Sequence, residues 1–236
     1  MEIRAYNKLY LDDAMESLAV MLDYAVNFYG WELDDFFLKF LKTDRLVGLF
    51  EQGDPNTISG CSGVDLYFRV IGDLRSNRKE YISYDRSPEY WVGWTLAYCQ
   101  WKMNRSFHDL FTLSKPSEII SWYPIYHEMD LEHVVDVLKE RQKKIPTGLE
   151  LRRRQLGFSQ TQLARISTVS LRSIQLYEQH QNEIERAQFN VLNALATALH
   201  CTVYDLVPDR MPANALNRNH LNTVHSGLIN GQARTQ

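Results

Sequence analysis

Residues 159–179 read SQTQLARISTVSLRSIQLYEQ, and this stretch decides how the second half of the chain folds. Ser159 is a favoured helix N-cap, and Gln162, three residues later, can complete a capping box. The apolar spacing breaks at residues 167–169, and Ser170 can then cap another helix. The stretch therefore predicts two short helices joined by a tight turn.

Residue size predicts how these two helices pack. Ala164 is small enough to stand where the helices cross, Val169 fills the turn, and Ile174 anchors the second helix from inside. The outward positions of the second helix are then Leu171, Arg172, Ser173 and Gln175. Such a pair is a helix-turn-helix, whose exposed helix end fits the ~12 Å wide major groove of DNA.

Three further helices are expected around this pair. Apolar residues at helical spacing predict one over residues 148–156 and a longer one over 187–200, and Thr202 can cap a short last helix. In the first helix of the pair we expect Leu163, Ala164 and Ile166 to face inward.

The spacing of these residues resembles that of a known family. The residues that carry the resemblance are GFSQxxLA at 157–164, VSxxxIxxYE at 169–178, LAxxL at 195–199 and VxDL at 203–206. Over about residues 149–207 the chain is similar to the Cro/CI, or XRE, type of helix-turn-helix domain. The resemblance implies a five-helix, lambda-repressor-like fold that binds double-stranded DNA, and we expect a homodimer. Thr168 and His180 stand where the family often has glycine in a left-handed conformation, which a β-branched residue adopts at a cost on the order of 1 kcal/mol.

The family resemblance implies specific DNA contacts. They are expected from Ser159, Gln160, Ser170, Arg172, Ser173 and Gln175. Gln160 corresponds to the glutamine that touches the DNA backbone and braces the recognition helix. Arg172, in the first turn of that helix, suits guanine, and Leu171 suits a thymine methyl group. Arg152, Arg153 and Arg154 are candidates for phosphate contacts, or otherwise form a solvated face.

The first half of the chain also predicts helices and no convincing strand, so the fold class is all-α. Residues 88–103 start with Ser87-Pro88-Glu89, a favourable helix beginning, and contain aromatic residues at 91, 94, 98 and 101. That spacing marks one helix face, and we expect it to lie in the core rather than in a ligand pocket or partner groove.

Charge separates the chain into an acidic and a basic part. Residues 1–138 hold 13 Lys and Arg against 22 Asp and Glu, and residues 139–236 hold 13 against 7. We therefore expect an acidic helical regulatory or partner domain over 1–143, a linker over 144–148, the helix-turn-helix domain over 149–207 and a disordered tail over 208–236. A basic second part favours a polyanionic partner.

The first half is also loosely similar to helical regions of antitoxin-like XRE regulators. The similarity rests on SPEYWVGWTLAYCQW at 87–101 and YPIYHEMD at 123–130. It implies a transcriptional regulator, a repressor, that could act as an antitoxin repressing its own operon, with a cognate toxin or a small ligand as the partner of the N-terminal domain.

Two other classes of protein stay open. One is a protein-interaction module whose helix-turn-helix has lost DNA binding. The other is an enzyme with an accessory DNA-binding domain. Its candidate clusters are Asp34-Asp35 and His127-Glu128 with Asp130, but adjacent acids face different sides of a helix and form no natural catalytic pair. We expect no catalytic residue and no cofactor. We also expect no metal site, since the three cysteines have neither zinc nor disulfide spacing.

Targeting and membrane signals are also missing from the sequence. No apolar run reaches the ~18 residues of a transmembrane helix, and the N-terminus is acidic where a signal peptide is basic and then apolar. We expect a cytoplasmic protein with no membrane partner.

Overall fold

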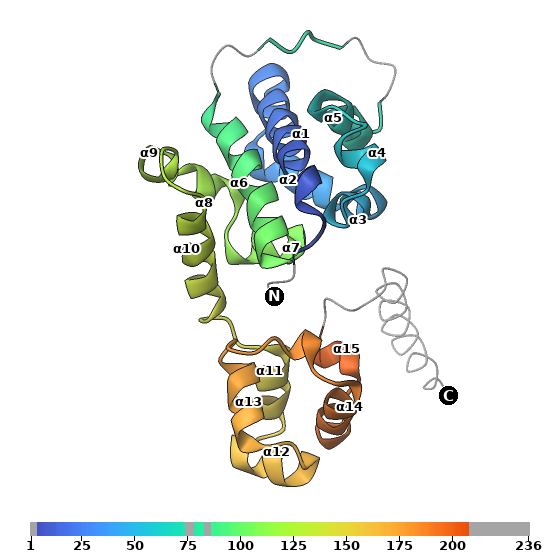
Figure 1. Cartoon of the computed structure of the whole chain (residues 1–236), viewed down its shortest axis with the longest axis vertical. Helices are drawn as coiled ribbons and strands as arrows, with labels where there is room; N and C mark the ends of the chain where they lie inside the picture. Colours follow the sequence, from blue (N-terminus) through green and yellow to red (C-terminus); the bar gives the residue numbers. More distant parts are fainter. Residues whose placement is uncertain (1–3, 74–77, 83–85, 208–236) are drawn as a thin grey trace, which may run out of the picture. The chain divides into compact units, whose positions relative to one another are not determined.

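The computed structural model describes residues 4–73, 78–82 and 86–207, and within these ranges every regular element is a helix (Figure 1). The prediction of an all-α fold is confirmed at this level. The predicted disordered tail, 208–236, lies outside the described residues. The chain divides between Gln142 and Lys143 into two compact units, here called unit 1 and unit 2, and each is described by itself.

Unit 1 consists of short helices around two longer ones. The elements are the 3-10 helix η1 (Lys8–Tyr10), α1 (Leu11–Asp23), the π-helical turn η2 (Tyr24–Phe28), α2 (Leu33–Leu41), α3 (Asp44–Glu51), α4 (Pro55–Ile58), α5 (Gly63–Ile71), α6 (Pro88–Met103), α7 (Phe107–Leu113), α8 (Pro116–Ile120), α9 (Tyr123–Tyr126) and α10 (Glu132–Gln142). Ser62, Ser87 and Ser106 cap α5, α6 and α7 through their hydroxyl groups.

Helix α1 lies between α5 and α6 and contacts both (Figure 1). Two glycines allow this close packing. A Cβ on Gly63 would lie 2.5 Å from the carbonyl oxygen of Ser17, and a Cβ on Gly93 would lie 2.6 Å from the Cα of Ala19. Since real Cβ atoms do not approach backbone so closely, the backbones meet there without side chains between them.

A cluster of phenylalanines fills the core beside α2, α3 and α7. Phe37, Phe40, Phe50 and Phe107 are all fully buried. The ring centroids of Phe40 and Phe107 are 5.7 Å apart at 64°, and those of Phe37 and Phe107 are 6.0 Å apart at 88°. Such edge-to-face pairs stabilise beyond the area they bury.

The aromatic face of α6 is only partly the core that the sequence predicts. Trp91 and Trp101 are buried, whereas Trp94 and Tyr98 are half-buried at its edge. The most deeply buried residues of α6 are on other faces, and include Val92 and Leu96. Helix α6 is covered on several sides by α1, α7, α8 and α10, so no single stripe marks its inner face.

Unit 2 contains the helices expected around residues 159–179. They are α11 (Gly148–Gln155), α12 (Gln160–Ser167), α13 (Leu171–Glu178), the 3-10 turn η3 (Ile184–Arg186), α14 (Phe189–Ala198) and α15 (Val203–Leu206). The core is aliphatic and includes Leu149, Leu163, Ile174, Leu195 and Leu199.

The three inward positions expected in α12 are confirmed only in part. Leu163 is buried and Ala164 is partly buried against the core, but Ile166 is 52% exposed. The prediction for Ile166 is wrong. In an eight-residue helix that packs on one side, only a few residues face the core. In α12 the buried residues are Leu163 and Ser167.

Among residues the structure describes, none of the helices combines the length and apolar character needed to cross a membrane.

Candidate nucleic-acid interface

Helix α12 begins with the capping box that the sequence predicts. The amide of Gln162 donates to the Ser159 hydroxyl oxygen over 3.1 Å, and the amide of Ser159 donates to the side-chain oxygen of Gln162 over 2.8 Å. Both hydrogen bonds satisfy amides that have no partner within the helix. Ser159 is therefore an exposed cap at the start of α12, where its hydroxyl is already used locally.

The turn between α12 and α13 contains a left-handed residue. Thr168 has φ 59° and ψ 12°, and its hydroxyl donates to the carbonyl of Ser167 over 2.6 Å. His180, just after α13, has φ 54°. These two residues therefore hold the backbone conformation for which glycine is favoured, at positions where non-glycine residues are strained.

The first turn of α13 faces outward. Ser170 caps the helix by accepting the amide of Ser173 over 3.0 Å, and the two hydroxyl oxygens are 2.7 Å apart. Leu171 is 37% exposed, and Arg172 is exposed and has no ion pair or hydrogen bond with any residue in the described ranges. A long cation with no internal partner is thus placed at the exposed start of this helix.

The far side of α13 is fixed to the core. Ile174 is fully buried, as expected, while Ser173 and Gln175 are half-buried. The structure therefore brings Ser170, Leu171 and Arg172 together on one exposed helical turn, with Ser173 and Gln175 at its border.

A buried polar cluster, here called the clamp, connects α11, α12 and α13. Arg153 donates from Nε and Nη2 to the two carboxylate oxygens of Glu178, over 2.7 and 2.8 Å. The side chains of Arg153 and Glu178 are only 10% and 3% exposed. Gln160 donates from Nε2 to the same carboxylate over 2.7 Å, and Arg153 also donates to the carbonyl of Phe158.

The clamp fixes the ionisation of Arg153 and the position of Gln160. The hydrogen bonds to Glu178 raise the pKa of Arg153, although its burial acts in the opposite direction. Bidentate charge-assisted pairs are among the strongest hydrogen bonds in proteins. Gln160 thus braces α13 from the start of α12, which is one of the two roles that the family resemblance implies for it.

The three consecutive arginines of α11 have different environments. Arg152 donates to the carbonyls of Leu199 and His200 at the end of α14, over 3.1 and 3.0 Å. Arg153 belongs to the clamp, and Arg154 pairs with Glu150 over 2.5 Å while staying 65% exposed. Arg153 is buried and cannot act as a phosphate contact or lie on a solvated face, so both readings of this residue are wrong.

Glu178 is the residue whose role sequence reasoning missed. It lies within the motif at 169–178, but an acid at the end of a short exposed helix gives no sign of burial by itself. What distinguishes Glu178 is its ion pair with an arginine of α11, 25 residues earlier. The spacing of residues within a single helix cannot predict such a contact.

The described residues hold no group of three or more His, Cys, Asp or Glu arranged to bind a metal ion. Comparisons with protein-family models, with curated proteins and with solved structures found no match for this chain.

Proposed function

We propose that unit 2 is a helix-turn-helix domain of the lambda-repressor type, and that the chain is a sequence-specific transcriptional repressor which binds double-stranded DNA as a homodimer. The observation that carries this proposal is the exposed first turn of α13, where Arg172 has no partner among the described residues, on a helix whose other end is held by the clamp. A DNA-reading helix has to offer side chains to base edges without moving against its own domain.

The clamp supports this proposal because a buried ion pair contributes more to a unique arrangement of the helices than to their stability. A buried ion pair seldom stabilises more than an apolar replacement, but it fixes one arrangement of the groups it joins. Here it fixes the helix that carries Arg172 relative to the one that begins at Gln160. Reading a base sequence requires that α13 is placed rigidly. A helix that is merely exposed to solvent has no such requirement.

Each predicted contact residue receives a role that fits its position. Arg172 reads guanine with two hydrogen bonds, and Leu171 contacts a thymine methyl group. Gln160 keeps a second N–H on the amide that binds Glu178, and this N–H is suited to a phosphate oxygen. We assign contacts with the DNA backbone to the capping hydroxyls of Ser159 and Ser170 and to Ser173 and Gln175 at the border of the exposed turn.

The test begins with selection of bound sequences from random DNA, using the full chain. A palindromic site would support both base reading and the homodimer. Fluorescence anisotropy at fixed salt then compares that site with a scrambled duplex. Arg172→Ala should weaken the selected site by about 1–3 kcal/mol more than the scrambled one, because a bidentate base contact is lost.

Two further variants make this test sharper. Gln160→Ala should weaken both duplexes to a similar degree, because a phosphate contact carries no sequence information. Arg186→Ala is the matched control, since Arg186 is already paired with Glu183. If Arg172→Ala leaves the ratio of the two affinities unchanged, Arg172 reads no base. If no DNA is selected, the reading as a protein-interaction module is favoured.

The antitoxin role remains a prediction about unit 1. Copurification of a stoichiometric second protein with the chain from its native cells would support it.

A further inference from the structure

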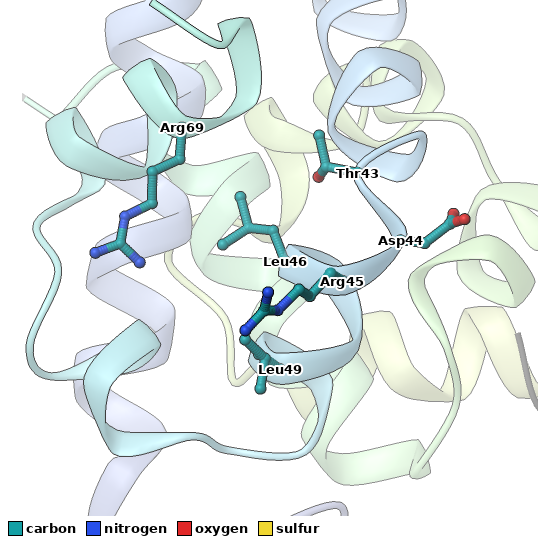
Figure 2. A pocket seen from close by; sticks show the side chains of 6 residues that line it. All are labelled: Thr43, Asp44, Arg45, Leu46, Leu49 and Arg69. Carbon is teal, nitrogen blue, oxygen red and sulfur yellow. The ribbon is translucent and has the colours of Figure 1, made fainter. Parts of the chain in front are cut away.

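Unit 1 has a surface hollow of about 510 Å³ between the start of α3 and the end of α5. It is lined by Thr43, Asp44, Arg45, Leu46, Leu49 and Arg69. Figure 2 shows the side chain of Arg45 next to Leu49 and that of Arg69 across from Leu46, whereas the carboxylate of Asp44 points away from both arginines. The volume lies in the range of ~300–1,000 Å³ that is usual for small-molecule sites.

The two arginines of the hollow are unusual in this unit because nothing in the described ranges pairs with them. Arg45 and Arg69 are exposed and form no ion pair, hydrogen bond or cation–π contact there. Other arginines of the unit are engaged: Arg4 with a carbonyl and Trp101, Arg78 with Asp65, Arg86 with Tyr90 and Trp94, and Arg141 with Glu118.

Two acids near these arginines in sequence do not pair with them. Asp65 lies one helical turn before Arg69, but its carboxylate accepts from Arg78 over 2.6 Å and from the Ser62 hydroxyl over 2.7 Å. Asp44 is adjacent to Arg45, and adjacent residues face different sides of a helix. Two guanidinium groups without an ion pair among the described residues therefore flank one hollow in the acidic half of the chain, and Asp44 also lines this hollow.

Two leucines give the hollow an apolar part. Leu46 and Leu49 are half-buried on α3, three residues apart and hence on neighbouring positions of one face. The hydroxyl of Thr43 already donates to the carbonyl of Phe40 over 2.6 Å. The site thus presents two guanidinium groups and the side chains of two leucines. Guanidinium groups match the geometry of carboxylate and phosphate, and leucine side chains match hydrocarbon.

We propose that this hollow binds a small anion with an apolar body, whose carboxylate or phosphate group is held by Arg45 and Arg69 while its hydrocarbon part covers Leu46 and Leu49. The inference concerns unit 1 alone and does not require the DNA binding proposed above, because the binding is measured without DNA.

The test is isothermal titration of the full chain with octanoate and, separately, with octyl phosphate, each below its micelle concentration. Acetate supplies the charge without the apolar body, and 1-octanol supplies the apolar body without the charge. Binding of either amphiphile supports the site and shows which headgroup it takes. Acetate and octanol should each bind at least about tenfold more weakly, since each lacks one half of the recognition.

Variants assign the binding to this hollow. Arg45→Gln and Arg69→Gln should each weaken the better amphiphile by about tenfold, while Arg69→Lys, which keeps the charge, should weaken it less. Lys115→Gln removes an exposed charge elsewhere in unit 1 and should leave binding within about twofold. Circular dichroism confirms that each variant is folded.

The proposal is overturned if neither amphiphile binds, if 1-octanol binds as tightly as the anions, or if the two arginine variants bind like Lys115→Gln. These outcomes are separate from those of the DNA test, so either proposal can fail alone.

Discussion

Different kinds of internal contact stabilise unit 1 and unit 2. Unit 1 has a large aromatic core, with fully buried phenylalanines from α2, α3 and α7 and glycines where helix backbones meet. Unit 2 has a smaller aliphatic core and, within it, the polar clamp of Arg153, Glu178 and Gln160. A small unit buries a lower fraction of its surface, so each apolar contact is worth proportionally more to it.

The difference shows where each unit is sensitive to change. Unit 1 should respond most to changes of side-chain volume. Unit 2 should respond most to the loss of a specific hydrogen-bonding group, because unpaired polar atoms in a small core are costly. Tryptophan fluorescence reports on unit 1, since all five tryptophans precede residue 143, and far-UV circular dichroism reports on both.

The largest effect is expected in the phenylalanine cluster of unit 1. Phe40→Ala should lower the free energy of unfolding by about 3–5 kcal/mol, because it leaves a cavity among rings that cannot collapse into it. Denaturant unfolding followed by tryptophan fluorescence measures this loss. Phe40→Leu is the control and should lose less. A Phe40→Ala protein as stable as the parent would mean that the cluster is not tightly packed.

The clamp of unit 2 is expected to be nearly as sensitive. Glu178→Ala should destabilise unit 2 by about 3–5 kcal/mol, because it leaves Arg153 buried and charged without its partner. The loss should appear in circular dichroism and not in the tryptophan transition. Glu183→Ala, which breaks the exposed pair with Arg186, should cost only about 0–1 kcal/mol.

A double variant separates the charge of the clamp from its shape. Arg153→Met combined with Glu178→Leu should be more stable than Glu178→Ala alone, because no unpaired charge remains. If the double variant is the less stable protein, the ion pair contributes stability as well as position.

Close helix packing in unit 1 predicts opposite effects for two glycines. Gly93→Ala should cost about 1–3 kcal/mol, because its Cβ would collide with the backbone of α1 at Leu18 and Ala19. Gly48 lies inside α3 with nothing within 4 Å of a new Cβ. Gly48→Ala should therefore stabilise by up to about 1 kcal/mol, since alanine is the better helix residue. Equal effects at the two positions would argue against the close approach of α1 and α6.

The smallest effect concerns the start of α12. Ser159→Ala should lower the stability of unit 2 by about 0.5–2 kcal/mol, because the amide of Gln162 loses its cap. Thr161→Ala, an exposed change in the first turn, should stay within about 0.5 kcal/mol of the parent. Thermal unfolding by circular dichroism compares the two. A similar loss in both would show that the cap contributes little.

Local signals in the sequence predicted much of the fold. Caps such as Ser87, Ser159, Ser170 and Thr202 mark helix starts, because a short side chain can satisfy only the amides that follow it directly. These positions required no knowledge of packing. The same local reasoning gave the exposed positions of Leu171 and Arg172, which follow a cap on a helix anchored by one residue, Ile174.

Contacts between distant residues could not be predicted in this way. Trp94 was expected in the core from its spacing in α6, but a helix covered on several sides has no unique inner stripe. Ile166 was expected inside from its apolar side chain, which gives no information on how few positions of α12 reach the core. The burial of Arg153 depends on Glu178 in another helix, and the hollow at Arg45 depends on α5 lying beside α3.

The packing of α1 against α6 also has a consequence for synthesis of the chain. Trp101 donates its ring N–H to the carbonyl of Tyr6, 95 residues earlier, and Gly93 meets Ala19. Helix α1 therefore leaves the ribosome long before its main partner exists, with an apolar surface uncovered until α6 emerges. Contacts so far apart slow folding and lengthen exposure to aggregation, so this half of the chain should depend on chaperones more than the half with the local contacts of α11 to α15.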